Sequence, residues 1–101
     1  MMEGRPVKFR ILEIFADEGR LWNYEVMDMV AKEYKDRSSR YGRRSTNWTL
    51  VELSASGFIA EVDAKLNDNP EYGTGGLSIK YGLTEIGRAE LERLKGIVKP
   101  R

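Results

Sequence analysis

The side chains best suited to chemistry in this chain of 101 residues are basic ones gathered in one short stretch. Residues 35–44 carry five cationic side chains against a single carboxylate, that of Asp36. Guanidinium groups pair bidentately with phosphate, so this stretch could hold a polyphosphate backbone. The N-terminus of the helix expected to follow would add its own attraction for anions. The cations are Lys35, Arg37, Arg40, Arg43 and Arg44.

The helix expected over residues 45–56 begins with side chains that can read base edges. Asparagine can bond adenine through paired hydrogen bonds, serine can bond several bases, and valine methyls can meet a thymine methyl. Trp48 has three open interpretations: a groove contact, a partner contact, or burial under the basic stretch. The residues predicted to bind DNA are Arg37, Arg40, Arg43, Arg44, Ser45, Asn47, Trp48 and Val51. The alternative is a solvated basic loop whose arginines pair with carboxylates of the hairpin.

Composition excludes several other kinds of chemistry. The chain contains no Cys and no His, which rules out disulfides, a cysteine nucleophile, zinc sites of the usual type and the commonest general base. No carboxylate pair stands out as a general acid and base, so we expect neither an enzyme nor a cofactor or metal site. No apolar run reaches the length of a signal peptide or a membrane span, so we expect a cytoplasmic protein without membrane contact.

The elements that must position the basic stretch are mostly helical. Apolar residues recur at helical spacing over residues 6–18 and 23–34, with Gly19 suited to end the first helix and Asn23 to cap the second. Residues 35–44 lack apolar periodicity and are expected to form a polar loop.

The third helix, residues 45–56, has a predicted core stripe of Thr46, Leu50 and Leu53, and Gly57 is expected to end it in a left-handed conformation. Its opposite face carries Trp48 and Val51, so we expect that face to be covered by something.

A hairpin and a last helix complete the predicted order. Residues 58–66 and 77–83 alternate apolar and polar side chains, as strands with one buried side do, and residues 67–76 form the loop between them. The last helix is expected over residues 84–98, with Thr84 as its cap. The side chains expected on the buried side of the first strand are Phe58, Ala60, Val62, Ala64 and Leu66.

Two stretches resemble winged-helix regulators of the PadR-like and MarR-like type, especially small archaeal ones. YGLTEIGRAELERL is similar to their last wing strand and following helix, and TNWTLVELSASGFIAE to their recognition helix and first wing strand. KFRILEIFADEG is loosely similar to their first helix. The resemblance covers nearly all of the chain and implies a single domain over residues 1–101, α+β but mainly α, with a three-helix core, a β-hairpin wing and a C-terminal helix.

The same resemblance implies a transcription regulator that binds double-stranded DNA, is usually a dimer, and places its third helix in the major groove. The hairpin is acidic, with Glu61, Asp63, Asp68 and Glu71 against Lys65, so we do not expect it to grip phosphates.

Two kinds of protein contact are also predicted. A homodimer through the terminal helices would use Phe9, Leu94, Ile97 and Val98. The rival function is a protein-interaction module in a larger assembly, with Trp48, Val51 and Ala55 forming the contact.

Overall fold

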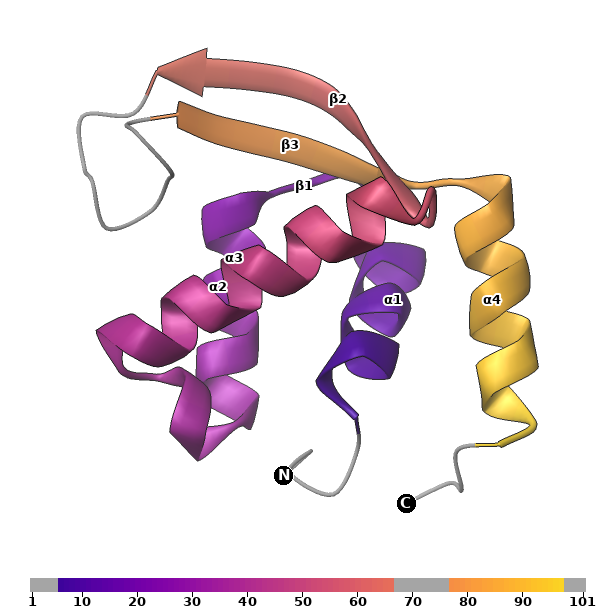
Figure 1. The fold of residues 1–101 in the computed structure, drawn as a ribbon, viewed down its shortest axis with the longest axis horizontal. Helices are drawn as coiled ribbons and strands as arrows, with labels where there is room; N and C mark the ends of the chain where they lie inside the picture. The colour runs from indigo at the N-terminus through magenta and orange to yellow at the C-terminus, as the bar shows by residue number, and fades with distance from the viewer. Residues whose placement is uncertain (1–5, 67–76, 98–101) are drawn as a thin grey trace.

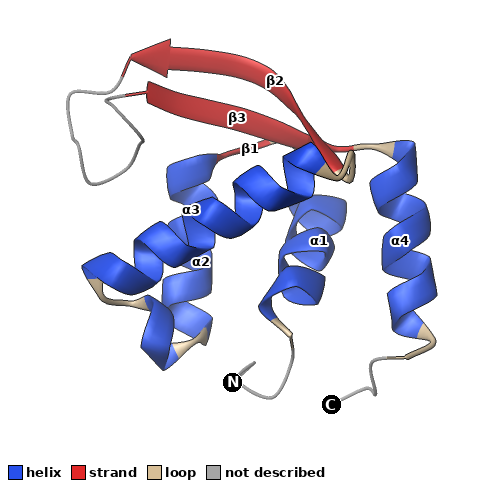
Figure 2. Cartoon of the chain, in the orientation of Figure 1, coloured by secondary structure: helices blue, strands red, loops and turns tan. Residues whose placement is uncertain are grey.

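Residues 6–66 and 77–97, the part of the chain described by the computed structural model, fold into four α-helices and a three-stranded antiparallel sheet. The protein is therefore α+β and mainly helical, as expected. Figure 1 follows the chain, and Figure 2 shows the helices gathered on one side of the sheet. The elements are α1 (Val7–Glu18), β1 (Leu21–Trp22), α2 (Asn23–Glu33), the 3-10 turn η1 (Lys35–Arg37), α3 (Arg40–Ala55), β2 (Ile59–Leu66), β3 (Leu77–Leu83) and α4 (Glu85–Lys95).

The first two helices begin and end within one residue of the predicted positions. Gly19 ends α1 with φ at 87°, a backbone conformation that glycine adopts at little cost. Asn23 does not cap α2, contrary to expectation, because it is the first helical residue and its side chain is buried. The free amide of Trp22 is instead satisfied by the carboxylate of Glu25, at 2.8 Å.

The hydrophobic core lies between the helices and the base of the sheet. Apolar side chains of α1, α2 and α3 pack there with Leu21 of β1, Tyr81 of β3 and Leu91 of α4. Phe9, predicted to lie at a dimer interface, is 2% exposed and belongs to this core. It lies off the main apolar stripe of α1 because that helix is buried over a wider face, with α2 on one side and α4 on the other.

The hairpin pairs as predicted, but its burial differs from the prediction. The strand order is β1-β3-β2, and the even-numbered side chains of β2 are exposed: Val62 is 42% and Leu66 is 86% accessible. Only Ile59, where the strand starts above the helices, is buried. The other residues of β2 are exposed, whereas β3 buries Ser78, Tyr81 and Gly82. The predicted loop, with Asp68 and Glu71, lies outside the described residues.

The last helix is fixed to the start of β2 by Thr84. Its hydroxyl accepts a hydrogen bond from the amide of Gly87 at 2.9 Å, which confirms the predicted cap, and donates to the carbonyl of Gly57 at 2.6 Å. The helix ends at Lys95 rather than at residue 98, and Val98 lies outside the described residues.

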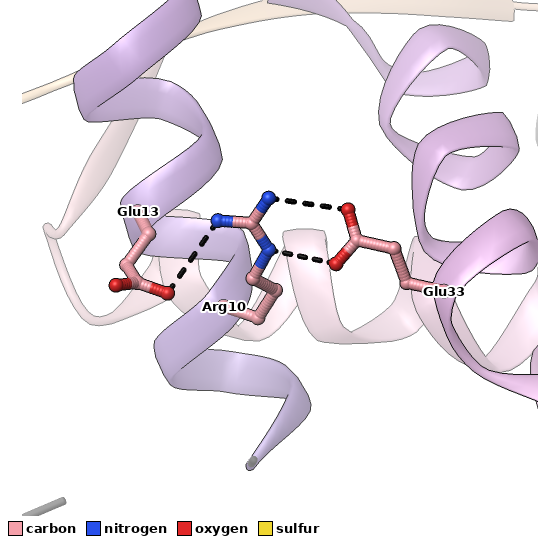
Figure 3. Close-up of polar contacts among 3 residues, drawn as sticks. All are labelled: Arg10, Glu13 and Glu33. Atoms are coloured by element: carbon pink, nitrogen blue, oxygen red, sulfur yellow. Dashed lines mark hydrogen bonds and ion pairs between the residues drawn. The ribbon is translucent and has the colours of Figure 1, made fainter. Parts of the chain in front are cut away.

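A half-buried ion pair joins α1 to α2 (Figure 3). Arg10 donates from Nε to one carboxylate oxygen of Glu33 at 2.7 Å and from a terminal nitrogen to the other at 3.1 Å. Glu13 adds a longer contact of 3.5 Å. Glu33 raises the pKa of Arg10 above its ordinary value, because the carboxylate accepts hydrogen bonds from the charged guanidinium and so favours its charged form.

Replacing Glu33 with glutamine is expected to lower the free energy of unfolding by about 1 kcal/mol, because a bidentate charged contact becomes a weaker neutral one. Urea denaturation at neutral pH measures the change. The matched control is Glu92→Gln, which weakens the exposed pair with Lys95 and should change stability by less than about 0.5 kcal/mol. Equal effects of the two changes would contradict a special role for the pair between α1 and α2.

Candidate nucleic-acid interface

The basic stretch is mostly helical, which corrects the prediction of a loop over residues 35–44. Helix α3 begins at Arg40, five residues earlier than predicted, and residues Lys35–Arg37 form η1 just before it. The hydroxyl of Ser39 accepts a hydrogen bond from the amide of Gly42 at 3.0 Å and so caps the helix. Apolar periodicity could not reveal this start, because the first inward-facing position is Gly42, which has no side chain.

Gly42 also lets η1 lie directly against α3. A Cβ atom at this position would stand 2.4 Å from the carbonyl oxygen of Asp36 and 2.5 Å from the Cα of Arg37. Only a residue without a side chain permits this approach. The lack of a side chain at Gly42 therefore allows the two basic segments, η1 and the start of α3, to lie in direct contact.

Helix α3 has a buried face and an exposed one, as predicted. Thr46, Leu50 and Leu53 are at most 1% exposed, whereas Trp48 on the opposite face is 62% exposed. At 100° per residue, Arg40, Arg44, Trp48, Val51 and Ala55 fall along that exposed face, over the full length of the helix. The expectation that something covers it is not met by any segment the structure describes.

The arginines of this region differ in their partners. Arg43 forms an ion pair with Asp28 of α2, so most of its charge is compensated. Arg37 donates to the hydroxyl of Ser45 at 3.0 Å, and that neutral partner leaves its charge in place. Arg44 is exposed and forms no ion pair with any residue in 6–66 or 77–97. Arg40 is exposed as well.

Among the described residues, the carboxylates of β2 form no ion pair with Arg37, Arg43 or Arg44. Arg43 is paired by α2, and neither Glu61 nor Asp63 forms an ion pair with Arg37 or Arg44 within the described part of the chain. The basic end of α3 therefore keeps net positive charge. Figure 1 shows that the hairpin projects toward the same end of the molecule as the N-terminal half of α3.

Asn47 is a correction to the predicted set of base-reading residues. It is 9% exposed, and its side-chain oxygen accepts a hydrogen bond from the amide of Asn23 at 3.3 Å. The side-chain oxygen of Asn23 in turn accepts from the backbone amide of Ile79 at 3.3 Å. Asn47 thus joins α3 to α2 and β3 and fixes the angle of the helix, since a buried amide left without a partner costs stability.

A second contact, which sequence patterns did not reveal, holds the hairpin on the start of α2. Trp22 and Tyr24 are stacked with ring centroids 6.2 Å apart, and the ammonium of Lys65 lies 4.3 Å from the Trp22 ring. Lys65 also donates to the Tyr24 hydroxyl at 2.9 Å, and Lys80 lies 5.7 Å from the Trp22 ring. These residues come from four separate elements, β1, α2, β2 and β3, so no local spacing could place them together.

The remaining predicted residues divide between the core and the surface. Ser45 is half-buried and accepts a hydrogen bond from Arg37, Val51 is exposed, Leu94 is half-buried and Ile97 is exposed.

Among residues 6–66 and 77–97 there is no group of three or more side chains suited to hold a metal ion. None of the described helices is both long enough and apolar enough to cross a membrane.

Comparison of the chain with protein-family models, with curated proteins and with solved structures finds no significant match. The geometry above is therefore the basis for assigning a function.

Proposed function

We propose that this chain is a winged helix-turn-helix domain that binds double-stranded DNA as a sequence-specific transcription regulator. The element order supports the fold: helix, short strand, two helices, a hairpin that pairs with the short strand, and a final helix. The observation that carries the function is the exposed face of α3, which presents Arg40 and Arg44 in its first turns and Trp48 beyond them.

The dimensions of α3 suit the major groove. Its 16 residues span about 24 Å, and a groove about 12 Å wide admits one helix. With the exposed face in the groove, Arg40 and Arg44 reach phosphates at the groove edge, and η1 brings Lys35 and Arg37 to the same strand. Trp48 and Val51 then meet base edges, where apolar groups contact thymine methyls.

Fluorescence-anisotropy titration of duplex DNA at several salt concentrations tests the proposal. Three or four phosphate contacts give a slope of log affinity against log salt of about −3. Replacing both Arg40 and Arg44 with glutamine is expected to weaken binding about tenfold or more and to reduce the slope by about 2, because two phosphate contacts are removed.

The control removes the same charge elsewhere. Lys8 and Arg88 are exposed on α1 and α4, so the Lys8→Gln, Arg88→Gln double variant should bind nearly as the unchanged protein does. If both double variants lose the same affinity, binding follows net charge alone and the α3 interface is wrong. Absence of binding below about 100 µM at low salt would reject the DNA function altogether.

The exposed apolar part of α3 favours a second candidate, a protein-interaction module. Trp48 and Val51, with Ala55 one turn later, form an apolar strip beside Glu52, and aromatic anchors of this kind dominate protein interfaces. If the titration shows no binding to DNA, a protein partner becomes the better candidate for this surface. Loss of DNA affinity in a Trp48→Ala variant that stays folded would instead support a contact between this surface and the major groove.

A further inference from the structure

The outer face of the sheet, which points away from the helices, carries cations beside a pair of stacked aromatic rings. Tyr81 belongs to the core, so Ser78 and Lys80 of the same strand point to the opposite side. Register places Trp22 of β1 beside Lys80. It places Lys65 of β2 beside Ser78. These side chains therefore share one face, and Figure 2 shows the helical layer on the other side of the sheet.

Two small residues of β3 let long side chains cross this outer face. β3 is the central strand, so Lys65 must cross it at Ser78 to bring its ammonium 4.3 Å from the indole ring of β1. Further along the strand, a Cβ atom at Gly82 would lie 3.3 Å from Cγ of Arg20, so the Arg20 side chain lies over that position. With Lys80 between them, the three cations form a row about 13 Å long over β3.

These three cations have no carboxylate partner in the described part of the chain. Within residues 6–66 and 77–97, none of Arg20, Lys65 and Lys80 forms an ion pair. Asp63 lies opposite Lys80, but its carboxylate accepts a hydrogen bond from the next backbone amide at 2.8 Å. Glu61 is opposite a core residue of β3 and so lies on the helix-facing side. The outer face therefore keeps net positive charge, although the hairpin sequence carries more carboxylates than cations.

The aromatic rings beside the cations form a flat platform. Trp22 and Tyr24 are half-buried and lie within 9° of parallel. The ammonium of Lys65 lies 4.3 Å from the first ring and 5.1 Å from the second, where a flat group would stack. An exposed cation–π contact is worth about two- to fivefold in an equilibrium constant. Stacking of a nucleobase on an aromatic ring is worth about five- to 100-fold, so a base can displace the exposed Lys65 from the rings.

We propose that the outer face binds single-stranded nucleic acid, stacking a base on Trp22 and Tyr24 and holding the adjoining phosphates with Arg20, Lys65 and Lys80. Proteins that hold single strands without sequence preference combine aromatic rings with a positively charged track in this way. An acidic protein segment would use the cations and leave the rings without a role. Duplex DNA does not fit, because its bases are stacked on one another inside the helix. The inference does not depend on duplex binding by α3.

The buried hydroxyl of Ser78 supports the same occupant. Ser78 is fully buried where Lys65 crosses β3, and its Oγ has no hydrogen-bond partner among the described residues. A buried hydroxyl without a partner costs stability. When a base displaces Lys65 from the rings, this hydroxyl becomes accessible to the polar edge of the base and gains a partner.

Tryptophan fluorescence tests the stacking directly. The chain has two tryptophans, so Trp48→Phe leaves Trp22 as the only one. An oligothymidylate of about 15 nucleotides is expected to quench Trp22 saturably at low salt, with a dissociation constant below about 100 µM. Unchanged Trp22 fluorescence at that concentration would overturn the proposal. So would quenching of Trp48 in the converse variant, Trp22→Phe, because the strand would then lie on α3.

Charge substitutions test the phosphate contacts. Lys65→Gln combined with Lys80→Gln should weaken oligothymidylate binding about tenfold and reduce the salt slope by about 1.4, because two phosphate contacts are removed. The matched control is the Lys8→Gln, Arg88→Gln double variant, which removes the same charge from exposed positions of α1 and α4 and should bind as the unchanged protein does. Equal losses in the two double variants would show that binding follows net charge, and the outer face would be wrong.

A competition experiment separates stacking from charge. Polyglutamate of the same length and similar charge should displace the oligothymidylate at least tenfold less well, because it has no bases to stack. Trp22→Leu should weaken oligothymidylate binding about tenfold while leaving the circular dichroism spectrum unchanged. If polyglutamate competes equally, the rings take no part, an acidic protein segment becomes the better occupant, and the proposal fails. This competition uses the unchanged protein, so it decides the matter even if Trp22→Leu does not fold.

Discussion

Replacing Gly87 with alanine is expected to lower the free energy of unfolding by about 2 kcal/mol and the melting temperature by about 10 °C. A Cβ atom at this position would stand 1.9 Å from the carbonyl oxygen of Phe58 and 2.8 Å from a methyl of Leu83. That oxygen also accepts a hydrogen bond from the amide of Thr84 at 3.1 Å, so the backbone there cannot yield without loss. Alanine favours a helix by up to about 1 kcal/mol, and the clash outweighs that gain.

The matched control for Gly87 is Gly96→Ala in the last turn of the same helix. Its nearest neighbour would be a carbonyl oxygen at 3.5 Å, an ordinary contact, and its φ is negative. Stability should therefore stay unchanged or rise by about 0.5 kcal/mol. Thermal and urea denaturation of both variants at one low protein concentration decide the matter. If Gly87→Ala is as stable as Gly96→Ala, the contact between α4 and the backbone of Phe58 adjusts more easily than this argument requires.

The helices could be predicted because each carries its own local signal. The apolar spacing of α1 and α2 and the cap at Thr84 are written in consecutive residues, and the structure places these features within a few residues of the prediction. The prediction missed the start of α3 because that part of the helix lacks a local apolar signal. Its first turn is polar and faces η1 through Gly42, and this contact leaves no apolar trace in the sequence.

Burial was less predictable than secondary structure. Alternation in β2 correctly indicates a strand, but it does not determine whether the apolar side chains are covered. Val62 and Leu66 are exposed, and the register shift between Glu61 and Asp63 breaks the alternation, so the even-numbered residues do not keep to one side along the whole strand. A local sequence pattern can indicate a strand, but it cannot show which of its side chains the rest of the fold covers.

For the candidate interface, the sequence predicts the basic cluster and the exposed face of α3, but it predicts only part of the set of exposed residues. The charge cluster and the two faces of α3 follow from residue order alone, and Arg40, Arg44, Trp48 and Val51 are exposed as the prediction requires. Asn47 lies at the border between the faces, where a small rotation of the helix decides its burial. The structure turns it inward to meet Asn23, a residue 24 positions away.

The second prediction with a large expected effect concerns Gly42, where alanine should lower the free energy of unfolding by about 2 kcal/mol and weaken DNA binding about tenfold. The added methyl would meet backbone atoms of Asp36 and Arg37 at 2.4–2.7 Å, so η1 must move away from α3. This displacement would separate Arg37 from Ser45 and spread the cations that are proposed to reach one phosphate strand. Denaturation and anisotropy titration of the same sample measure the two effects.

The control for Gly42 is Ser45→Ala, which removes the hydrogen bond from Arg37 and leaves η1 in its place. If the position of η1 matters, Ser45→Ala should bind DNA within about threefold of the unchanged protein, since the phosphate contacts remain. Stability lost without any change in affinity would mean that Lys35 and Arg37 take no part in binding, and the interface would then shrink to Arg40, Arg44 and the groove-facing residues of α3. Equal losses in both variants would assign the effect to the Arg37–Ser45 bond. The pair thus separates the arrangement of the backbone from a single side-chain contact, which net charge alone cannot do.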